Sequence, residues 1–184
     1  MENCITSDFL SASVCRNAGS TESLKARGVY RITCIDSAGR PKWVAVAPNL
    51  VVDEGKNAML DDYFDGSTAG TFYMSLITAG SPVATATYAA PLVTEISDAV
   101  IGARGTVSWL AASGGVKTAV TTSFAITGTA TITGNMVVSG STAAAIVGDT
   151  AAGDGVLFSC AVFALGSKAV LAGDILNVVY SIGL

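Results

Sequence analysis

The sequence predicts a mainly β protein, an antiparallel two-sheet sandwich of jelly-roll type with about eight strands and one helix near residues 53–65. Three observations support this class. Short runs rich in valine, threonine and aromatic residues recur along the chain, and glycine-rich loops separate them. One segment has apolar residues at helical spacing. The high content of threonine, valine and glycine excludes a helical bundle.

The first two expected strands form a hairpin. Residues 29–36 read VYRITCID and residues 42–51 read KWVAVAPNLV, so both runs are rich in β-branched and aromatic residues. The intervening SAGRP is a cluster of turn-forming residues. Two strand-like runs joined by a short turn that contains glycine predict an antiparallel hairpin.

The helix is expected directly after this hairpin. Asp53 can cap its N-terminus, Glu54 lies in its first turn, and the helix is expected to end near Gly66. The apolar residues that recur at helical spacing are Ala58, Met59, Tyr63 and Phe64.

Strand signals return after residue 70. The expected strands cover residues 71–78, 104–111, 118–139 with a division near 127–129, 156–164 and 175–183. In strand 71–78, Phe72, Met74 and Leu76 share one face. The bulky residues Tyr73 and Ile77 occupy the opposite face. We therefore expect this strand to be buried on both sides.

Residues 1–28 differ from the rest of the chain, and we divide the protein into an N-terminal arm, 1–28, and a β-sandwich domain, 29–184. The arm is rich in Ser, Asn, Ala and Thr and has no sustained hydrophobic period. This pattern is typical of a segment that becomes ordered only on contact with a partner. The isolated apolar residues that we take as candidate interaction residues are Ile5, Phe9, Leu10 and Val14.

Composition excludes several classes of function. A chain of 184 residues can bury a substantial core, and with 51% apolar and 13% charged residues it is not intrinsically disordered. A net charge of −4 argues against a nucleic-acid partner. The chain has no histidine, which excludes Ser-His-Asp and Cys-His catalysis and most zinc and haem sites. We therefore expect no enzyme activity, no catalytic residues, no metal and no cofactor.

The chain is also expected to stay out of membranes. Its longest uncharged stretch, residues 118–148, is interrupted by threonine and glycine, whereas a spanning helix needs about twenty predominantly apolar residues. Residues 1–15 carry Glu2 and Asp8 where a signal peptide needs basic residues. The cysteines form no CxxC pair, which favours free thiols in a reducing cytosol. They are Cys4, Cys15, Cys34 and Cys160.

Charge is distributed unevenly along the sequence. Residues 1–66 contain 16 of the 24 charged residues, and residues 99–184 contain only 6. A monomer in water would normally carry more charge over such a long segment. We therefore expect a homo-oligomer, a dimer or a trimer, that covers part of this surface.

Two groups of carboxylates are possible sites with a simpler alternative. The cluster Glu54, Asp61, Asp62 and Asp65 could do paired-carboxylate chemistry, but we interpret it as a solvated helix face. In the loop VGDTAAGDG, Asp149 and Asp154 could hold a calcium ion weakly, although a turn is favoured because the other ligands of a calcium loop are missing. Trp43 and Trp109 lie in strand-like runs, and we expect them in the core or at an interface.

The order of residues 28–78 is the most specific feature of the sequence. It reads GVYRITCIDSAGRPKW, then NLVVDEGKNAMLDDYF, then TFYMSLIT. This order resembles a family of tailed-bacteriophage virion proteins, and GVLFSCAVF and VLAGDILNVVYSI are similar to later segments of such proteins. The positions that carry the likeness are Gly28, Asp36, Gly39, Lys42, Trp43, Asn49, Leu50, Val51, Gly55, Leu60, Phe64, Tyr73, Leu76 and Ile77.

The resemblance implies a structural component of the virion. The function it implies is that of a capsid cement or decoration protein on the capsid surface, assembled in the host cytoplasm, with the major capsid protein and itself as partners. A receptor-binding or fibre-associated module of the virion is the alternative. Ser75 replaces a glycine that is common in the family, and residues 85–97 keep only Glu95 of a longer family stretch. The middle loops are therefore expected to differ in shape.

Overall fold

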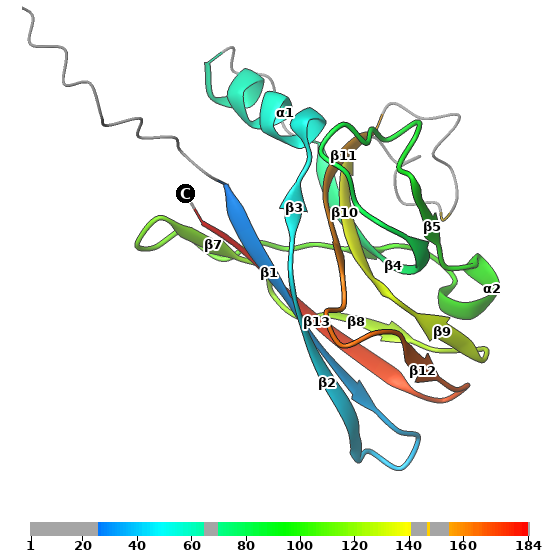
Figure 1. Ribbon diagram of the computed structural model, residues 1–184. Helices are drawn as coiled ribbons and strands as arrows, with labels where there is room; N and C mark the ends of the chain where they lie inside the picture. The colour runs from blue at the N-terminus through cyan, green and yellow to red at the C-terminus, as the bar shows by residue number, and fades with distance from the viewer. Residues whose placement is uncertain (1–25, 65–69, 141–146, 148–154, 184) are drawn as a thin grey trace, which may run out of the picture.

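The computed structural model describes residues 26–64, 70–140, 147 and 155–183. The protein is mainly β, with antiparallel sheets, which confirms the predicted fold class. Two larger sheets, here called sheet I and sheet II, face each other, and α1 lies at one end (Figure 1).

Sheet I brings the two ends of the described chain together. The last strand pairs along its whole length with the first, from Arg27 opposite Gly183 to Ile35 opposite Ile175. The strand order is β2-β1-β13-β7, and β8 also pairs with β13. The bounds are β1 (Arg27–Ile35), β2 (Pro41–Pro48), β7 (Val116–Thr118), β8 (Thr122–Ala125) and β13 (Ile175–Gly183).

Sheet II has the order β3-β11-β10-β4-β5, and β6 also pairs with β4. Its bounds are β3 (Leu50–Val51), β4 (Thr71–Gly80), β5 (Val93–Glu95), β6 (Gly105–Thr106), β10 (Gly134–Gly140) and β11 (Val156–Val162). A separate two-stranded ladder joins β9 (Ala130–Ile132) to β12 (Lys168–Val170).

Two helices complete the described chain. The first, α1 (Asp53–Phe64), begins with Asp53 and Glu54, whose negative charges suit a helix N-terminus. Gly55 allows α1 to approach β11, because a Cβ at this position would lie 2.4 Å from the carbonyl oxygen of Phe158. The second, α2 (Asp98–Ile101), is a single turn capped by the Ser97 side chain, which accepts from the Ala99 N–H.

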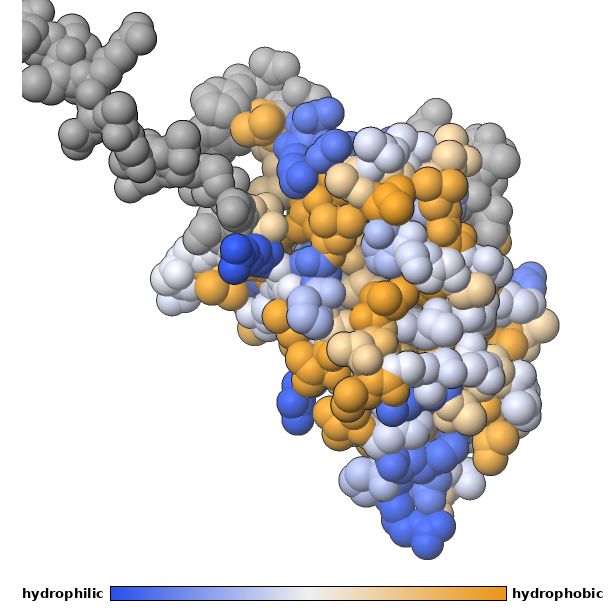
Figure 2. All heavy atoms as spheres, in the orientation of Figure 1, coloured by the Kyte–Doolittle hydropathy of each residue, from blue (hydrophilic) through white to orange (hydrophobic). Residues whose placement is uncertain are grey.

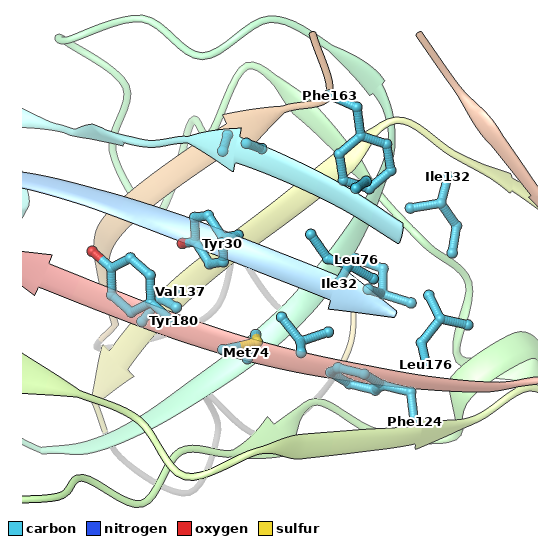
Figure 3. Close-up of a cluster of buried hydrophobic side chains, with 14 of the residues drawn as sticks. Tyr30, Ile32, Met74, Leu76, Phe124, Ile132, Val137, Phe163, Leu176 and Tyr180 are labelled. Carbon is cyan, nitrogen blue, oxygen red and sulfur yellow. The ribbon is translucent and has the colours of Figure 1, made fainter. Parts of the chain in front are cut away.

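The main core lies between the two sheets. Figure 3 shows the side chains of sheet I pointing toward those of sheet II. Tyr30 and Tyr180 stack within it, with ring centroids 4.5 Å apart. The hydroxyls of Tyr30 and Ser159 lie 2.6 Å apart and form a hydrogen bond across the core from β1 to β11. This bond satisfies a polar group that would otherwise be costly to bury.

A second buried cluster covers the outer face of sheet II. Tyr88, from the connection between β4 and β5, packs there with Tyr73, Ile77, Met136 and Leu157. Met74 and Leu76 of the same strand β4 belong to the core between the sheets. The prediction that strand 71–78 is buried on both faces is therefore confirmed.

Several expected elements differ in detail. The expected strand 42–51 is divided at Asn49, because β2 pairs in sheet I and β3 crosses to sheet II. The expected strand 104–111 forms ladder pairs only at Gly105 and Thr106, and Trp109 makes an isolated bridge to Ala119. The described residues contain thirteen strands, many of them very short, and a second helix. A jelly-roll connectivity stays a prediction.

The scarcity of charge after residue 99 has a cause inside the chain. Strands β10, β11 and β13 are internal strands with neighbours on both sides. Nearly every residue of β10 and β11 is buried on both faces of sheet II. Charged side chains are excluded from such positions. Burial therefore accounts for the lack of charge in β10 and β11, whereas much of residues 105–131 is exposed and carries only Lys117. The expected homo-oligomer stays a prediction.

Candidate interaction surfaces

Two of the positions that carry the sequence resemblance, Asp36 and Gly39, lie in the turn between β1 and β2. The Asp36 side chain accepts hydrogen bonds from the backbone N–H groups of Ala38 and Arg40, at 2.9 and 2.8 Å. Gly39 has a φ of 79°, a left-handed conformation that favours glycine. Both positions therefore determine the shape of a turn.

Asn49 and Gly28 connect the two sheets where the chain crosses from β2 to β3. The Asn49 side-chain amide donates to the Tyr180 hydroxyl at 2.7 Å. A Cβ on Gly28 would lie 2.8 Å from the Asn49 side-chain oxygen and 2.6 Å from the Ser181 carbonyl oxygen. Trp43 is half-buried, packs against the core and donates its indole N–H to the Ala169 carbonyl at 3.2 Å. These positions are structural.

A small polar cluster closes the lower end of sheet I. The Asp174 carboxylate pairs with Lys42, accepts the Leu171 N–H at 2.9 Å, and accepts the Cys34 thiol at 3.7 Å. Burial alone would raise the pKa of Asp174, but the hydrogen bonds from Lys42 and Leu171 outweigh it and hold this pKa below its ordinary value. Burial, reinforced by the Asp174 charge, raises the pKa of Cys34 to about 11. The thiol therefore acts as a donor and stays un-ionised.

A second ion pair holds the edge of sheet II. The Arg104 guanidinium meets the Glu95 carboxylate through two bonds of 2.7 Å, and donates to the Tyr88 hydroxyl at 2.9 Å. Burial alone would lower the pKa of Arg104, but the bonds to Glu95 outweigh it and raise this pKa. The group attaches the β4–β5 connection to the sheet.

The acidic cluster of α1 is divided by the structure. Glu54 is half-buried and accepts the backbone N–H groups of Tyr88 and Leu157, both at 2.7 Å. The interpretation of Glu54 as part of a solvated face is therefore wrong, because this carboxylate links α1 to the outer cluster of sheet II. The side chain of Asp61 and the residue Asp65 lie outside the described part of the chain.

The outer face of sheet I is an exposed surface with an apolar character, and we call it the open face. Burial alternates strictly along β1 and β13, with one row buried in the core and the other outside. Val29 of β1 and Val44 and Val46 of β2 are 41–50% exposed, and Val179 of β13 is half-buried. The open face consists of Val29, Arg31, Thr33, Ile35, Val44, Val46, Pro48, Ser123, Ala125, Ile175, Asn177, Val179 and Ser181.

Charge is nearly absent from the open face. Arg31 is the one charged residue of the set just defined, and Arg27, at the start of the same exposed row of β1, adds a second charge at its edge. At the end of β1 the chain becomes strongly polar, and the hydrophilic lower tip of the molecule in Figure 2 is the β1–β2 turn with Asp36 and Arg40. With strands about 4.8 Å apart and 3.3 Å per residue, the open face has an area of roughly 400–500 Å².

A cavity opens at one end of the core, between the sheets, and we call it the end pocket. It has a volume of about 390 Å³. Phe72 stands edge-on to both Trp109 and Phe158, with ring centroids 5.5 and 5.4 Å apart. Its lining is almost entirely apolar, and the side chain of Lys117 adds the one charged group among the lining residues.

The structure leaves the predicted interaction residues untested. Ile5, Phe9, Leu10 and Val14 lie outside the described residues, as do Asp149 and Asp154. Sequence reasoning did not single out the open face, although the alternation of residues 29–35 and 175–183 was a usable signal for it. The end pocket had no such signal, because its walls come from five distant parts of the chain.

Within the described residues, no group of three or more acidic or thiol side chains is placed to hold a metal ion. No described helix has the length and apolar character needed to cross a bilayer. Comparison with protein-family models, with curated proteins and with solved structures finds no match to this chain.

Proposed function

We propose that this chain is a structural protein of a tailed-phage virion, a cement or decoration protein that binds the major capsid protein and stabilises the capsid lattice. The proposal rests on the sequence resemblance of residues 28–78 and on one structural observation, the open face. This face is exposed, poor in charge and rich in β-branched residues, whereas a buried cluster covers the outer face of sheet II. A sandwich with one bare face is suited to docking against another protein.

The size of the open face fits a contact that is repeated over a lattice. An area of roughly 400–500 Å² is about half of what one partner contributes to a stable pairwise interface, about 800 Å². One such contact is weak. Several contacts engaged at once by a homo-oligomer, as we propose for this protein, multiply the effective concentration.

The distribution of aromatic residues disfavours the alternative, a receptor-binding or fibre-associated module. Such a module would present exposed aromatic side chains on its loops. None of the aromatic side chains that the structure describes is exposed. Cys34 pairs with Asp174 and Arg104 with Glu95 inside the fold, and Cys160 is buried, so we also propose that the protein is not an enzyme.

The proposal is tested by co-sedimentation with shells assembled from the major capsid protein of the same phage. The test variant is Val44→Glu with Val46→Glu, which places two charges in the middle of the open face. The matched control is Val83→Glu with Leu92→Glu, two exposed apolar residues of the β4–β5 connection on the opposite side of the sandwich.

We expect the wild type and the control to sediment with the shells and the open-face variant to stay in the supernatant. Circular dichroism checks that both variants keep their β spectrum. Retained binding by a folded open-face variant would contradict the proposal. Loss of binding by the control alone would place the contact on the side of sheet II instead.

A further inference from the structure

We propose that the end pocket is filled by Phe9 and Leu10 of the chain's own N-terminal segment. This inference is independent of the proposed function. It rests on the chemistry of the pocket, on where the chain enters the sandwich, and on the residues available in the segment.

The pocket demands an apolar occupant. Its walls include Met59 of α1, Phe72 of β4, Phe158 of β11 and Ile182 of β13, and Trp109 and Val116 also line it. Val116 is 43% exposed, although it belongs to this apolar wall. Apolar surface left in water is costly, at about 25 cal/mol per Å². A volume of about 390 Å³ is at the small end of ligand pockets, which suits a few side chains.

The chain enters the sandwich next to this pocket. Arg27 pairs with Gly183, and Gly183 pairs with the lining residue Val116, so the first strand begins two strands away from Val116, about 10 Å. Ala26 already packs against the core cluster that contains the pocket walls. Figure 1 shows the start of β1, the end of β13 and β7 at the same end of the molecule, below α1.

The segment before Ala26 carries a suitable occupant. Phe9 and Leu10 are adjacent large apolar residues, and Asp8 precedes them. Lys117 is exposed at the pocket lining, so Asp8 can meet a positive charge there when Phe9 enters. A pair of apolar side chains beside one acidic group thus matches an apolar pocket with one basic group.

The length of chain between Leu10 and the first strand favours an occupant from the same chain over one from a second copy. Residues 11–26 separate Leu10 from the first strand, and a chain of that length spans up to about 50 Å when extended. The distance to be covered is far shorter. A tether of this length gives an effective concentration near the millimolar range, above that of a second copy in ordinary solution.

Trp109 supplies the readout for the test. The chain has two tryptophans, so Trp43→Phe leaves Trp109 as the single reporter, at the pocket itself. In this full-length background, the test variant is Phe9→Ser with Leu10→Ser. The matched control is Ile5→Ser with Val14→Ser, which removes as much apolar character from the same segment.

Acrylamide quenching of Trp109 is the measurement. We expect the quenching constant to rise and the emission to shift to longer wavelength in the Phe9/Leu10 variant, with the control unchanged. No change in the Phe9/Leu10 variant, or an equal change in the control, would overturn the proposal. Quenching that rises on serial dilution of the parent protein would also overturn it, because the occupant would then come from a second copy.

A charge exchange tests the placement of Asp8. Lys117→Glu is expected to raise the quenching of Trp109, and adding Asp8→Lys to it is expected to restore the original value. An exchange variant that stays as easily quenched as Lys117→Glu alone would show that Asp8 does not lie beside Lys117, and would overturn this placement of the segment.

Discussion

Arg31 and Val46 lie opposite each other in β1 and β2, side by side on the outer face of sheet I. Both side chains are exposed, and their nearest other neighbours on this face are Val29, Thr33, Val44, Pro48 and Val179. A row of this kind on an isolated sheet normally carries alternating charges for solubility. Alternating charges are absent from the open face, and for this reason we regard the open face as an interface.

The first prediction concerns assembly in solution. We expect the purified protein to sediment as a dimer or trimer at micromolar concentration, and the Val44→Glu, Val46→Glu variant to keep that oligomeric state while losing capsid binding. Analytical ultracentrifugation measures both states. A variant that becomes monomeric would show instead that the open face joins copies of this chain to one another.

The second prediction concerns the buried ion pair of sheet II. Glu95→Gln removes the carboxylate charge that the buried Arg104 guanidinium meets, and we expect a loss of about 3–5 kcal/mol in the free energy of unfolding. Replacing both residues, Glu95→Leu with Arg104→Met, should cost clearly less than the sum of Glu95→Leu alone and Arg104→Met alone, which with the wild type complete the cycle. Urea unfolding of the four proteins measures this coupling, and additive losses would contradict it.

The third prediction concerns the thiols of the sandwich. Cys34 and Cys160 are fully buried, and burial raises the pKa of Cys160 to about 12. Because the thiolate is the reactive form, we expect neither residue to be alkylated in the native protein at mildly alkaline pH. Peptide mapping after iodoacetamide treatment, with and without urea, tests this expectation. Alkylation of Cys160 before unfolding would show that β11 opens readily.

The fourth prediction concerns acid stability. The folded pKa of Asp174 lies below its ordinary value of 3.8, so its ionised form stabilises the fold at pH values above 3.8. This contribution is lost as the pH falls toward the lowered pKa, where the carboxylate takes up a proton and releases Lys42. We expect Asp174→Asn to be less stable at neutral pH and to lose less stability on acidification. Urea unfolding at several pH values measures how the free energy of unfolding of the wild type and of Asp174→Asn depends on pH. The same pH dependence in both proteins would contradict the role given to Asp174.

Local sequence patterns predicted the strands that alternate or that are buried throughout. Buried and exposed residues alternate around Tyr30 and Ile32 because sheet I has one exposed face. The run around Met74 is apolar on both sides because both faces of sheet II are covered at this strand. The crossing at Asn49 escaped prediction, because nothing in KWVAVAPNLV indicates that its ends pair with different sheets. The short helix α2 had its signals, Ser97 before it and Gly102 after it, but four residues are too few for a hydrophobic period.

The ion pairs and interaction surfaces could be predicted from the sequence less well than the strands, because they depend on contacts between distant parts of the chain. Pairing of Glu95 with Arg104, and of Lys42 with Asp174, requires the sheets to be assembled first. The same holds for the end pocket, where Phe72 and Trp109 meet only because β4 and the segment before β7 converge. Composition predicted that some surface is poor in charge, but only the register of β1, β2 and β13 shows that this surface is the open face.

The location of the protein on the particle tests the proposed function most directly. Tailed-phage particles that carry this chain with a small affinity tag can be purified, labelled with gold and imaged in negative stain. We expect the label at regular positions over the capsid shell. Label confined to the tail or its fibres, or purified particles that contain none of the chain, would contradict a role as a capsid cement protein.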